Sequence, residues 1–283
     1  MALPALLAMT WPLIGPPPAL ASSTVLAFAL AVIVGALDDL ADLPTLPKLL
    51  GEAMVGGVLA ASAWLDGASA WTVTSLALLP LITQNAFNFV DGSDGLLASV
   101  ALGIFAAGAV LSWSVQDAGG VTFVGAVAAA AVAGFLPWNL PRARVFMGDG
   151  GSLLLGAVYA WCTVRAFDAR WELGWAWLAL GTPIVGDVGT CLLRRMARGA
   201  EWWRAHREHA YQRVVARTGS HGSALAWAMG LELLVAIPAA IACMRFGSMP
   251  AVLALAVCAM VAWWGGSGRA AVPKKTDAGG VDR

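Results

Sequence analysis

Residues 95–115 read GLLASVALGIFAAGAVLSWSV and contain no charged side chain. A bilayer core about 30 Å thick needs about 20 apolar residues of helix, so this stretch is long enough to span it. Comparable apolar runs lie at 19–37, 49–65, 72–87, 121–138, 151–167, 173–190, 224–244 and 249–264. A shorter run at 2–14, followed by three consecutive prolines, is a doubtful tenth. The sequence therefore predicts an all-α, polytopic transmembrane helical bundle of about nine to ten spans.

The composition agrees with a membrane protein. The 283 residues are 59% hydrophobic and 12% charged, and the mean hydropathy is +0.75. Soluble domains carry about 25% charged residues, so a single large soluble core is excluded. The 14 Trp and 32 Gly are typical of membrane helices, which place aromatic rings at the interface and pack closely. The formal net charge is zero, so it gives no information about nucleic-acid or acidic partners. The four cysteines stand singly in apolar stretches and are expected to be small core residues.

Basic residues predict the orientation of the spans. If the spans alternate, one set of connections consists of 38–48, 88–94, 139–150, 191–223 and the tail after residue 264. This set holds every Lys and Arg except Arg165, Arg170 and Arg245. Positively charged loops remain in the cytoplasm, so this set is predicted to be the inner one, in an inner membrane. We expect one transmembrane domain over 1–264 and a disordered cytoplasmic tail over 265–283.

Polar residues are concentrated in three segments of the inner connections. The segments are Asp38-Asp39-Leu40-Ala41-Asp42, Asn85-Ala86-Phe87-Asn88-Phe89-Val90-Asp91-Gly92-Ser93-Asp94-Gly95 and Phe146-Met147-Gly148-Asp149-Gly150-Gly151-Ser152. Two unit charges 4 Å apart cost about 4 kcal/mol at an effective dielectric constant of 20, so converging carboxylates require a cation. Oxygen ligands without His or Cys favour Mg²⁺ or Mn²⁺. A lone Asp in such a loop is more often a helix cap, which is the expectation for Asp42.

Phosphate is the anion that these segments are suited to bind. Asp94-Gly95 and Asp149-Gly150 begin predicted helices whose first N–H groups face the inner surface. Lys48 and the arginines of 191–223 add positive charge nearby. The ring of Phe146 offers a flat surface for a base, although such a ring is more often an interfacial anchor. Hydrogen-bonding partners for the sugar or base are Asn88, Asp91 and Asp94.

The fourth inner loop, 191–223, contains His206-Arg207-Glu208-His209-Ala210-Tyr211-Gln212-Arg213. One interpretation is an amphipathic interfacial helix anchored by Trp202 and Trp203. A second, compatible interpretation is a site for an anionic headgroup. Asp187 and Glu52 fall within predicted spans, where ionisable residues are costly and are functional candidates by default. Glu52 lies one turn from the interface and is left unassigned.

Taken together, these segments resemble the polyprenyl-phosphate N-acetylhexosamine-1-phosphate transferases. Residues 38–42 resemble the family's DDxxD element, 85–96 its NxxNxxDGxDGL element, and 146–156 its FMGDxGSxxxG element. Pro183 and Asp187 with the Arg194-Arg195 pair are similar to its PxxD…RR segment. His206 to Gln212 is similar to the HxxHAYQ form seen among O-antigen initiators. The matches occur in family order from about residue 32 to 215.

The resemblance implies an activity and a set of roles. Sugar-1-phosphate would pass from a UDP-N-acetylhexosamine to undecaprenyl phosphate with Mg²⁺ or Mn²⁺, releasing UMP. Asp38, Asp39 and Asp149 would be the catalytic and metal-binding residues. The resemblance also implies substrate-binding residues, which are Lys48, Asn85, Asn88, Asp91, Asp94, Phe146, His206, Arg207 and His209. The partners are these two substrates and membrane lipid, without nucleic acid, and a homodimer is left open.

Two alternatives accompany this hypothesis. Only 37 residues precede Asp38, and they lack the basic Pro-Thr-Pro-Arg-Gly-Gly type loop that the family carries before the Asp pair. The first alternative is therefore a catalytically impaired, N-terminally truncated homologue. The second is a cation-coupled transporter, which would need carboxylates near the middle of the bilayer and discontinuous helices in a repeated arrangement.

Overall fold

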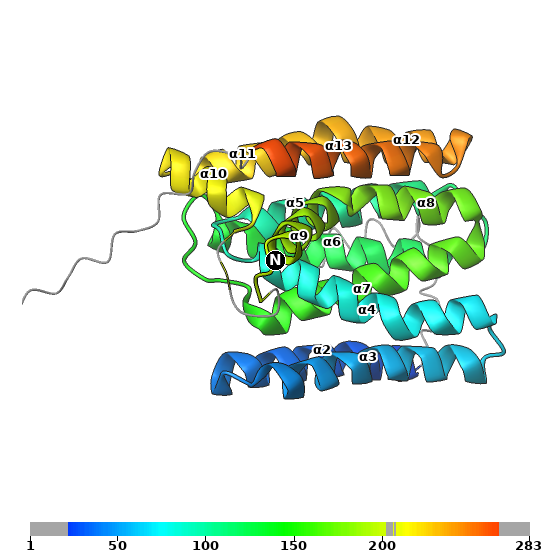
Figure 1. Cartoon of the computed structure of the whole chain (residues 1–283). Helices are drawn as coiled ribbons and strands as arrows, with labels where there is room; N and C mark the ends of the chain where they lie inside the picture. Colours follow the sequence, from blue (N-terminus) through cyan, green and yellow to red (C-terminus); the bar gives the residue numbers. More distant parts are fainter. Residues whose placement is uncertain (1–21, 202–205, 207, 266–283) are drawn as a thin grey trace, which may run out of the picture.

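The computed structural model describes residues 22–201, 206 and 208–265, which form helices joined by short turns and loops (Figure 1). No strand occurs within these ranges. The long helices are α2 (Ser22–Ala41), α3 (Thr45–Leu65), α4 (Ala70–Val90), α5 (Leu96–Trp113), α6 (Gly119–Asn139), α7 (Gly148–Ala169), α9 (Thr182–Ala197) and α13 (Met249–Gly265). The shorter ones are α8 (Trp171–Leu180), α10 (Ala210–Thr218), α11 (His221–Leu231), the π-helical turn η1 (Glu232–Ala236) and α12 (Ile237–Phe246).

The all-α, polytopic character predicted from the sequence is confirmed. Six helical segments are long and apolar enough to cross a membrane, or seven if the bent α8–α9 pair is one span. These are fewer than the nine to ten spans expected. Helix α7 is continuous, but its glycines and the charged residues near both of its ends make it less apolar than the six segments, and α13 is too short to be counted with them. The expected run at 2–14 and the tail after residue 265 lie outside the described residues.

The apolar run at 173–190 is broken instead of forming one straight span. Helix α8 ends at Leu180 and α9 begins at Thr182, with a bend of 62° between them. Pro183 stands in the first turn of α9, a position where the missing N–H does no harm. In Figure 1, α8 runs across the picture whereas α9 is seen almost end-on. The break changes the direction of the chain, and α9 packs against α13 and α4.

Helix α7 lies at the centre of the bundle and contacts α2, α3, α4, α5, α6 and α8. Its closest approach to α4 is at Gly156, where a Cβ would lie 2.5 Å from the Cα of Gln84. Thr83 Oγ1 donates a hydrogen bond of 2.7 Å to the Gly156 carbonyl. Small residues at membrane-helix interfaces let the backbones approach in this way. Gly156 therefore fixes α4 and α7 side by side.

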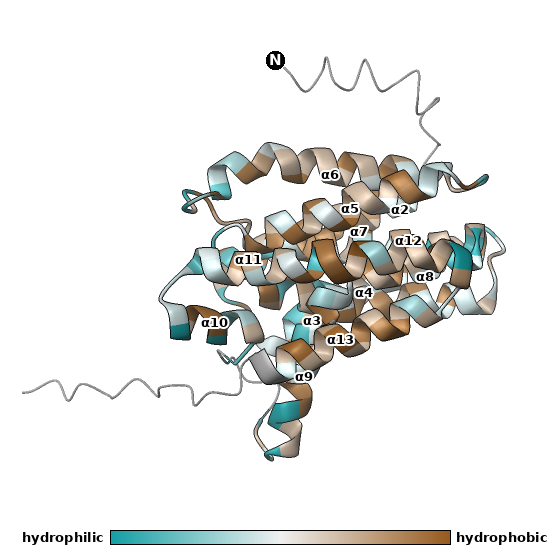
Figure 2. Ribbon diagram, turned by 90° about the horizontal axis from the view of Figure 1, so that it is seen from above, coloured by the Kyte–Doolittle hydropathy of each residue, from teal (hydrophilic) through white to brown (hydrophobic). Residues whose placement is uncertain are grey.

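The polar connections gather at one end of the bundle. Consecutive long helices run in opposite directions, so the loop after α2, the end of α4 and the start of α7 come to the same end. Figure 2 shows the hydrophilic residues mainly at helix ends and in loops, with hydrophobic residues along the helices between them. A cavity of about 450 Å³ lies at the other end, lined among others by Asp66, Asp117 and Arg165.

Candidate active site

Lys48 joins two carboxylates from distant parts of the chain. Its ammonium group donates a hydrogen bond of 2.6 Å to Asp38 Oδ2, and it also forms an ion pair with Asp149. The backbone N–H of Leu43 donates to the other Asp38 oxygen at 2.9 Å. Asp38 belongs to the last turn of α2, Lys48 to the first turn of α3 and Asp149 to the first turn of α7. The structure therefore brings two of the three predicted catalytic residues to one cation.

Asp39 has a different position from its neighbour Asp38. Its Oδ1 accepts a hydrogen bond of 3.0 Å from the Asp149 N–H, and its Oδ2 accepts one of 3.3 Å from the Gly150 N–H. A carboxylate at a helix N-terminus satisfies donors that have no partner within the helix and interacts favourably with the helix dipole. The N–H groups that the sequence analysis assigned to a phosphate are thus partly occupied by Asp39. Asp39 therefore anchors α2 to α7.

Gly35 allows this close contact between α2 and α7. A Cβ on Gly35 would lie 2.3 Å from the carbonyl carbon of Asp149 and 2.4 Å from the Gly150 nitrogen. These are backbone atoms, which cannot move aside as the end of a flexible side chain can. Gly148, which precedes Asp149, has a positive φ of +69°, a conformation that glycine adopts without strain. The sequence analysis did not identify Gly35, because its role depends on a helix more than a hundred residues away.

The end of α4 contributes amide and carboxyl groups to the same region. Asn88 Nδ2 donates a hydrogen bond of 3.1 Å to Ser152 Oγ in α7. Asp91 follows α4 and accepts a hydrogen bond from the Gly148 backbone N–H. Burial, together with the charge of the nearby Asp149, raises the pKa of Asp91 to about 7. Asp91 is therefore held beside the Asp38–Lys48–Asp149 group with a carboxyl that releases its proton near neutral pH.

Asn85 points to a different partner. Its side-chain amide donates to the carboxylate of the buried Glu52 and, at 2.9 Å, to the Leu81 carbonyl. Because its donors are used in this way, Asn85 positions Glu52 between α3 and α4. Glu52, which the sequence analysis left unassigned, is thus part of the support beneath the acidic end.

Asp94 and Gly95 form the turn into α5. The Gly95 N–H donates to Asn139 Oδ1 at 2.9 Å, so it is not an open anion donor. Ser93 Oγ lies 2.9 Å from His221 Nδ1, and the Asp94 N–H lies 3.4 Å from the same nitrogen. The Asp94 residue is half-buried. This turn connects the acidic end to α6 and α11.

Phe146 lies before α7 with 60% of its surface exposed. The exposed Phe146 side chain is accessible from outside the protein, and its role toward a base stays a prediction. Arg207, which the family resemblance assigns to substrate binding, lies outside the described residues.

Asp42 is exposed and has a positive φ of 47°. Its backbone N–H donates a hydrogen bond of 2.9 Å to the Asp38 carbonyl. Asp42 thus follows the end of α2, whereas the residue before the next helix, α3, is Pro44, and no side chain caps that helix.

The fourth loop packs directly against the end of α4. Tyr211 donates a hydrogen bond of 2.9 Å from its hydroxyl to the Phe89 carbonyl. The ring of Phe89 lies 5.6 Å from that of His209 and 6.4 Å from that of His206, measured between centroids. A Cβ on Gly92 would lie only 2.4 Å from the Tyr211 hydroxyl. The two histidines therefore lie near the Asp91 turn. Trp202 and Trp203, the expected anchors of an interfacial helix, lie outside the described residues.

Asp187 positions this loop and is not open to solvent. Its carboxylate accepts hydrogen bonds from the backbone N–H groups of Ala210, at 2.6 Å, and Tyr211, at 3.2 Å. These are the first two residues of α10, so Asp187 caps a helix that is distant in the sequence. An ionisable residue inside a predicted span was a functional candidate by default. In the structure its carboxylate instead caps α10.

Several arginines of the loop also have structural partners. Arg195 and Arg198 both pair with Glu208. Arg213 donates to the Ala262 carbonyl at 2.6 Å and also to the Glu208 carbonyl. These contacts tie the loop to α9 and α13. Of the cations described near the acidic end, Lys48 is the one that contacts the predicted catalytic carboxylates.

The donor set at the acidic end fits a hard divalent cation. Asp38 and Asp149 present carboxylate oxygens to one point, and that point already carries the positive charge of Lys48. Asp91 lies close enough for the charge of Asp149 to act on its pKa. Carboxylate oxygens without sulfur or imidazole suit Mg²⁺ or Mn²⁺. Asp39 fits less well, because both of its oxygens accept backbone N–H groups.

Fold and site together define a polytopic membrane protein with a cluster of carboxyl, amide and ammonium groups at one end of its helical bundle. Residues 21–167, more than half of the chain, match glycosyl transferase family 4. The chain belongs to this family. The matched residues include the acidic groups of α2, α4 and α7 but not the histidine loop.

Curated relatives agree with this membership. The chain is 32% identical over 196 residues to the undecaprenyl-phosphate alpha-N-acetylglucosaminyl 1-phosphate transferase of Thermotoga maritima. This match covers 65% of this chain and 60% of the relative. It is 37% identical over 169 residues to the decaprenyl-phosphate N-acetylglucosaminephosphotransferase of Mycobacterium tuberculosis, 51% of this chain and 41% of the relative. It is 38% identical over 133 residues to the phospho-N-acetylmuramoyl-pentapeptide-transferase of Moorella thermoacetica. This match covers 41% of this chain and 42% of the relative. The chain thus spans 41–60% of the length of these relatives.

Proposed function

We propose that this chain transfers N-acetylhexosamine-1-phosphate from a UDP-sugar to undecaprenyl phosphate, releasing UMP and forming a lipid-linked diphosphate sugar. Membership of glycosyl transferase family 4 supports this proposal, as do the printed activities of the relatives from Thermotoga maritima and Mycobacterium tuberculosis. The single observation that carries it is the meeting of Asp38 and Asp149 at Lys48.

The chemistry of the reaction explains why such a group is needed. An anionic lipid phosphate must approach a diphosphate that is itself negatively charged. Phosphoryl transfer is accelerated mainly by positioning the reactants and by neutralising charge. Lys48 supplies positive charge at the point where Asp38 and Asp149 converge. Asp91, whose pKa is about 7, is suited to take a residual proton from the lipid phosphate.

A divalent cation completes the proposed site. Asp149 and Asp38 would hold Mg²⁺ or Mn²⁺, and the ion would neutralise the diphosphate of the donor. Asp39, which the family resemblance assigns to the metal as well, is proposed to position Asp149 through the N-terminus of α7. Asn88 supports the same helix through Ser152.

The nucleotide and the lipid would bind to the side chains around this centre. Phe146, with its exposed ring, would stack on the uracil, and Asp94 would contact the nucleotide together with Asn88 and Asp91. The histidine loop would bind phosphate through His206, His209 and Arg207. Asn85 contributes indirectly, because its amide is engaged with Glu52.

The setting of the reaction follows from the charge distribution. The acidic end carries most of the basic residues, which supports an inner-membrane location with the site facing the cytoplasm. The HAYQ form of the loop, residues 209–212, supports the O-antigen-initiating branch and a role in cell-surface polysaccharide synthesis.

The transporter alternative has one feature in its favour. Glu232 is fully buried within the apolar helical segment His221–Phe246, and its two carboxylate oxygens have no hydrogen-bond partner among the described residues. The carboxylates of the acidic end, Asp38, Asp91 and Asp149, lie at helix ends, and the family match supports transfer chemistry. We therefore retain the transferase as the proposed function.

Detection of the lipid product tests the proposal. The detergent-solubilised full chain is incubated with Mg²⁺, undecaprenyl phosphate and UDP-N-acetylglucosamine or another UDP-N-acetylhexosamine, and the lipid fraction is analysed by mass spectrometry. We expect undecaprenyl diphosphate carrying one N-acetylhexosamine. Absence of this product with every UDP-sugar would support the catalytically impaired alternative.

A further inference from the structure

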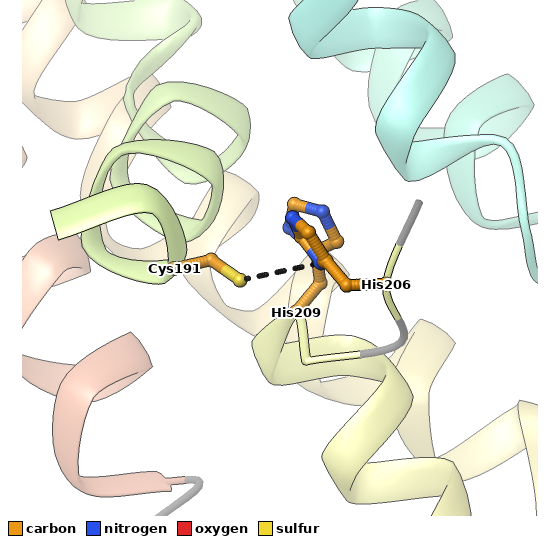
Figure 3. Close-up of side chains that lie close together, drawn as sticks. All are labelled: Cys191, His206 and His209. Carbon is orange, nitrogen blue, oxygen red and sulfur yellow. Dashed lines mark hydrogen bonds between the residues drawn. The ribbon is translucent and has the colours of Figure 1, made fainter. Parts of the chain in front are cut away.

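Cys191, His206 and His209 form a cluster that the acidic site does not use (Figure 3). Each residue offers one ligand atom, and these atoms all lie within 4.8 Å of one another. Cys191 Sγ lies 3.9 Å from His206 Nδ1, and the two imidazole rings are 4.9 Å apart between centroids. Cys191 comes from α9, whereas the histidines precede α10. Two of the three histidines in the chain are therefore gathered beside one cysteine.

The donor types at this cluster differ from those at the acidic end. Thiolate sulfur and imidazole nitrogen favour Zn²⁺ and similar ions, whereas Mg²⁺ requires oxygen. With Zn–N of about 2.0 Å and Zn–S of about 2.3 Å, tetrahedral ligands lie about 3.3–3.6 Å apart. The observed distance of 3.9 Å between Cys191 Sγ and His206 Nδ1 is close to this range. Small side-chain rotations would close the remaining difference.

A buried and unsatisfied nitrogen points to a missing ligand. His209 is 2% exposed, and its Nδ1 has no hydrogen-bond partner among the described residues. The Asp187 carboxylate lies 3.8 Å away, which is beyond a hydrogen bond. Buried polar atoms are nearly always paired, so an orphan nitrogen requires an explanation.

The surroundings hold the ligands in place. Asp187 caps α10 through the Ala210 and Tyr211 N–H groups, which fixes the segment that carries His209. Its carboxylate also lies 3.8 Å from His209 Nδ1, so it places a negative charge beside the cluster. Phe89 covers the two rings from α4. The site is thus supported by three separate helices.

We propose that Cys191, His206 and His209 bind one Zn²⁺ ion. Binding would convert the Cys191 thiol to a thiolate and release its proton to solvent. Three protein ligands leave a fourth position for water or for an oxygen of an anion. The phosphate that the proposed function assigns to His206 and His209 would then bind at this fourth position. Zinc binding itself is measured without substrates, so its test is independent of the transferase activity.

Cobalt spectroscopy and zinc analysis test the proposal. The full chain, purified through an affinity tag without histidine, is dialysed against a chelator and titrated with Co²⁺ and then Zn²⁺. We expect about one Zn²⁺ per chain, and a sulfur-to-cobalt absorption band that Zn²⁺ removes. In His206→Ala and Cys191→Ser we expect zinc affinity to fall at least about tenfold, as loss of supporting groups alone commonly costs that much. His206 is half-buried, so its replacement leaves the packing of the bundle largely intact.

Matched variants identify the ligands. Cys243→Ser removes a buried cysteine of α12, and His221→Asn removes the third histidine. Both should bind zinc as the wild type does, and so should Asp149→Asn. A cobalt spectrum without a sulfur band in the folded wild-type chain would overturn the proposal. So would zinc affinity that is unchanged in both His206→Ala and Cys191→Ser, or lost in Asp149→Asn alone.

Discussion

Gly35 lies directly against the backbone of Asp149, so that a Cβ on Gly35 would fall 2.3 Å from the Asp149 carbonyl carbon. The contact brings the last turn of α2 to the first turn of α7. It is the reason that Asp39 can reach the N–H groups of α7 and that Asp38 and Asp149 can share Lys48. The geometry of the site thus depends on a residue with no chemistry of its own.

Enlarging Gly35 should therefore disrupt the site. We expect Gly35→Ala to push α2 away from α7 and to reduce transfer activity about 100-fold, because displacements of about 1 Å have effects of that size. Overpacking should also destabilise the protein by about 1–3 kcal/mol. Initial rates and thermal unfolding in detergent measure the two effects.

Gly57 provides the matched control for this variant. It lies in α3, and a Cβ there would meet nothing within 4 Å. Gly57→Ala should leave the rate unchanged, and alanine in a helix is favoured over glycine by about 1 kcal/mol. Equal rates in the two variants would mean that the α2–α7 contact does not control the site.

Replacing Lys48 should leave two carboxylates without their cation. In Lys48→Met we expect transfer activity to fall about 100-fold, because groups that stabilise charge in phosphoryl transfer have effects of this size. In EDTA the melting temperature should fall, and Mg²⁺ should raise it more than in the wild type. Arg170→Gln is the control, since Arg170 pairs with exposed Glu172 at the other end of the bundle. A Mg²⁺ response equal to that of the wild type would contradict the shared cation site.

The pKa of Asp91 predicts a pH dependence of stability. Burial, together with Asp149, raises this pKa from 3.8 to about 7 in the folded chain. Between these values the folded state holds a proton that the unfolded state has released, so the contribution of Asp91 to stability falls as pH rises from about 4 to about 7. Asp91→Asn removes this contribution.

Melting curves at several pH values in EDTA test the sign of this effect. We expect the melting temperature of Asp91→Asn to exceed that of the wild type increasingly between pH 5 and 7, and the difference to be constant above about pH 8. Asp66→Asn, in the turn after α3 at the other end of the bundle, serves as the control. A difference that shrinks as pH rises would show that the pKa of Asp91 is lowered.

Gly92 and Tyr211 should behave as a coupled pair. A Cβ on Gly92 would lie 2.4 Å from the Tyr211 hydroxyl but 3.5 Å from the ring carbon that carries it. Gly92→Ala should therefore destabilise the chain and reduce activity. Tyr211→Phe alone should cost about 1 kcal/mol, for the lost hydrogen bond to the Phe89 carbonyl.

The double variant distinguishes this contact from independent effects. Because Tyr211→Phe removes the clashing oxygen, we expect Gly92→Ala with Tyr211→Phe to be more stable than Gly92→Ala alone. Denaturation of all four forms gives the coupling energy. Additive effects would contradict direct contact between the end of α4 and the fourth loop.

The sequence predicted the helical membrane fold well, because apolar runs such as 95–115 report burial in lipid directly. It also predicted which polar segments belong together, and the structure brings Asp38, Asp91 and Asp149 to the same end. The count of spans and the break between α8 and α9 were not predicted. A continuous apolar run contains the break, and only the turn at Gly181 and Pro183 marks it.

Partners distant in the chain explain the remaining differences. Asp39 and Asp187 have the residue type of ligands, yet each accepts backbone N–H groups from a helix that only the tertiary structure brings near. Cys191 was interpreted as a core residue because it stands singly in an apolar stretch, and it is buried in the structure. Fifteen positions separate it from His206, and folding of the loop closes that gap.

In the proposed mechanism, transfer requires a divalent cation that is held by Asp38 and Asp149. Release of UMP from the UDP-sugar in the presence of undecaprenyl phosphate tests this most directly, measured for wild type and Asp149→Asn with Mg²⁺ and with EDTA. We predict rapid release by the wild type with Mg²⁺ alone, and a loss of at least about 100-fold in each of the other three conditions. Release by the wild type at an equal rate in EDTA, or full activity of Asp149→Asn, would contradict the claim.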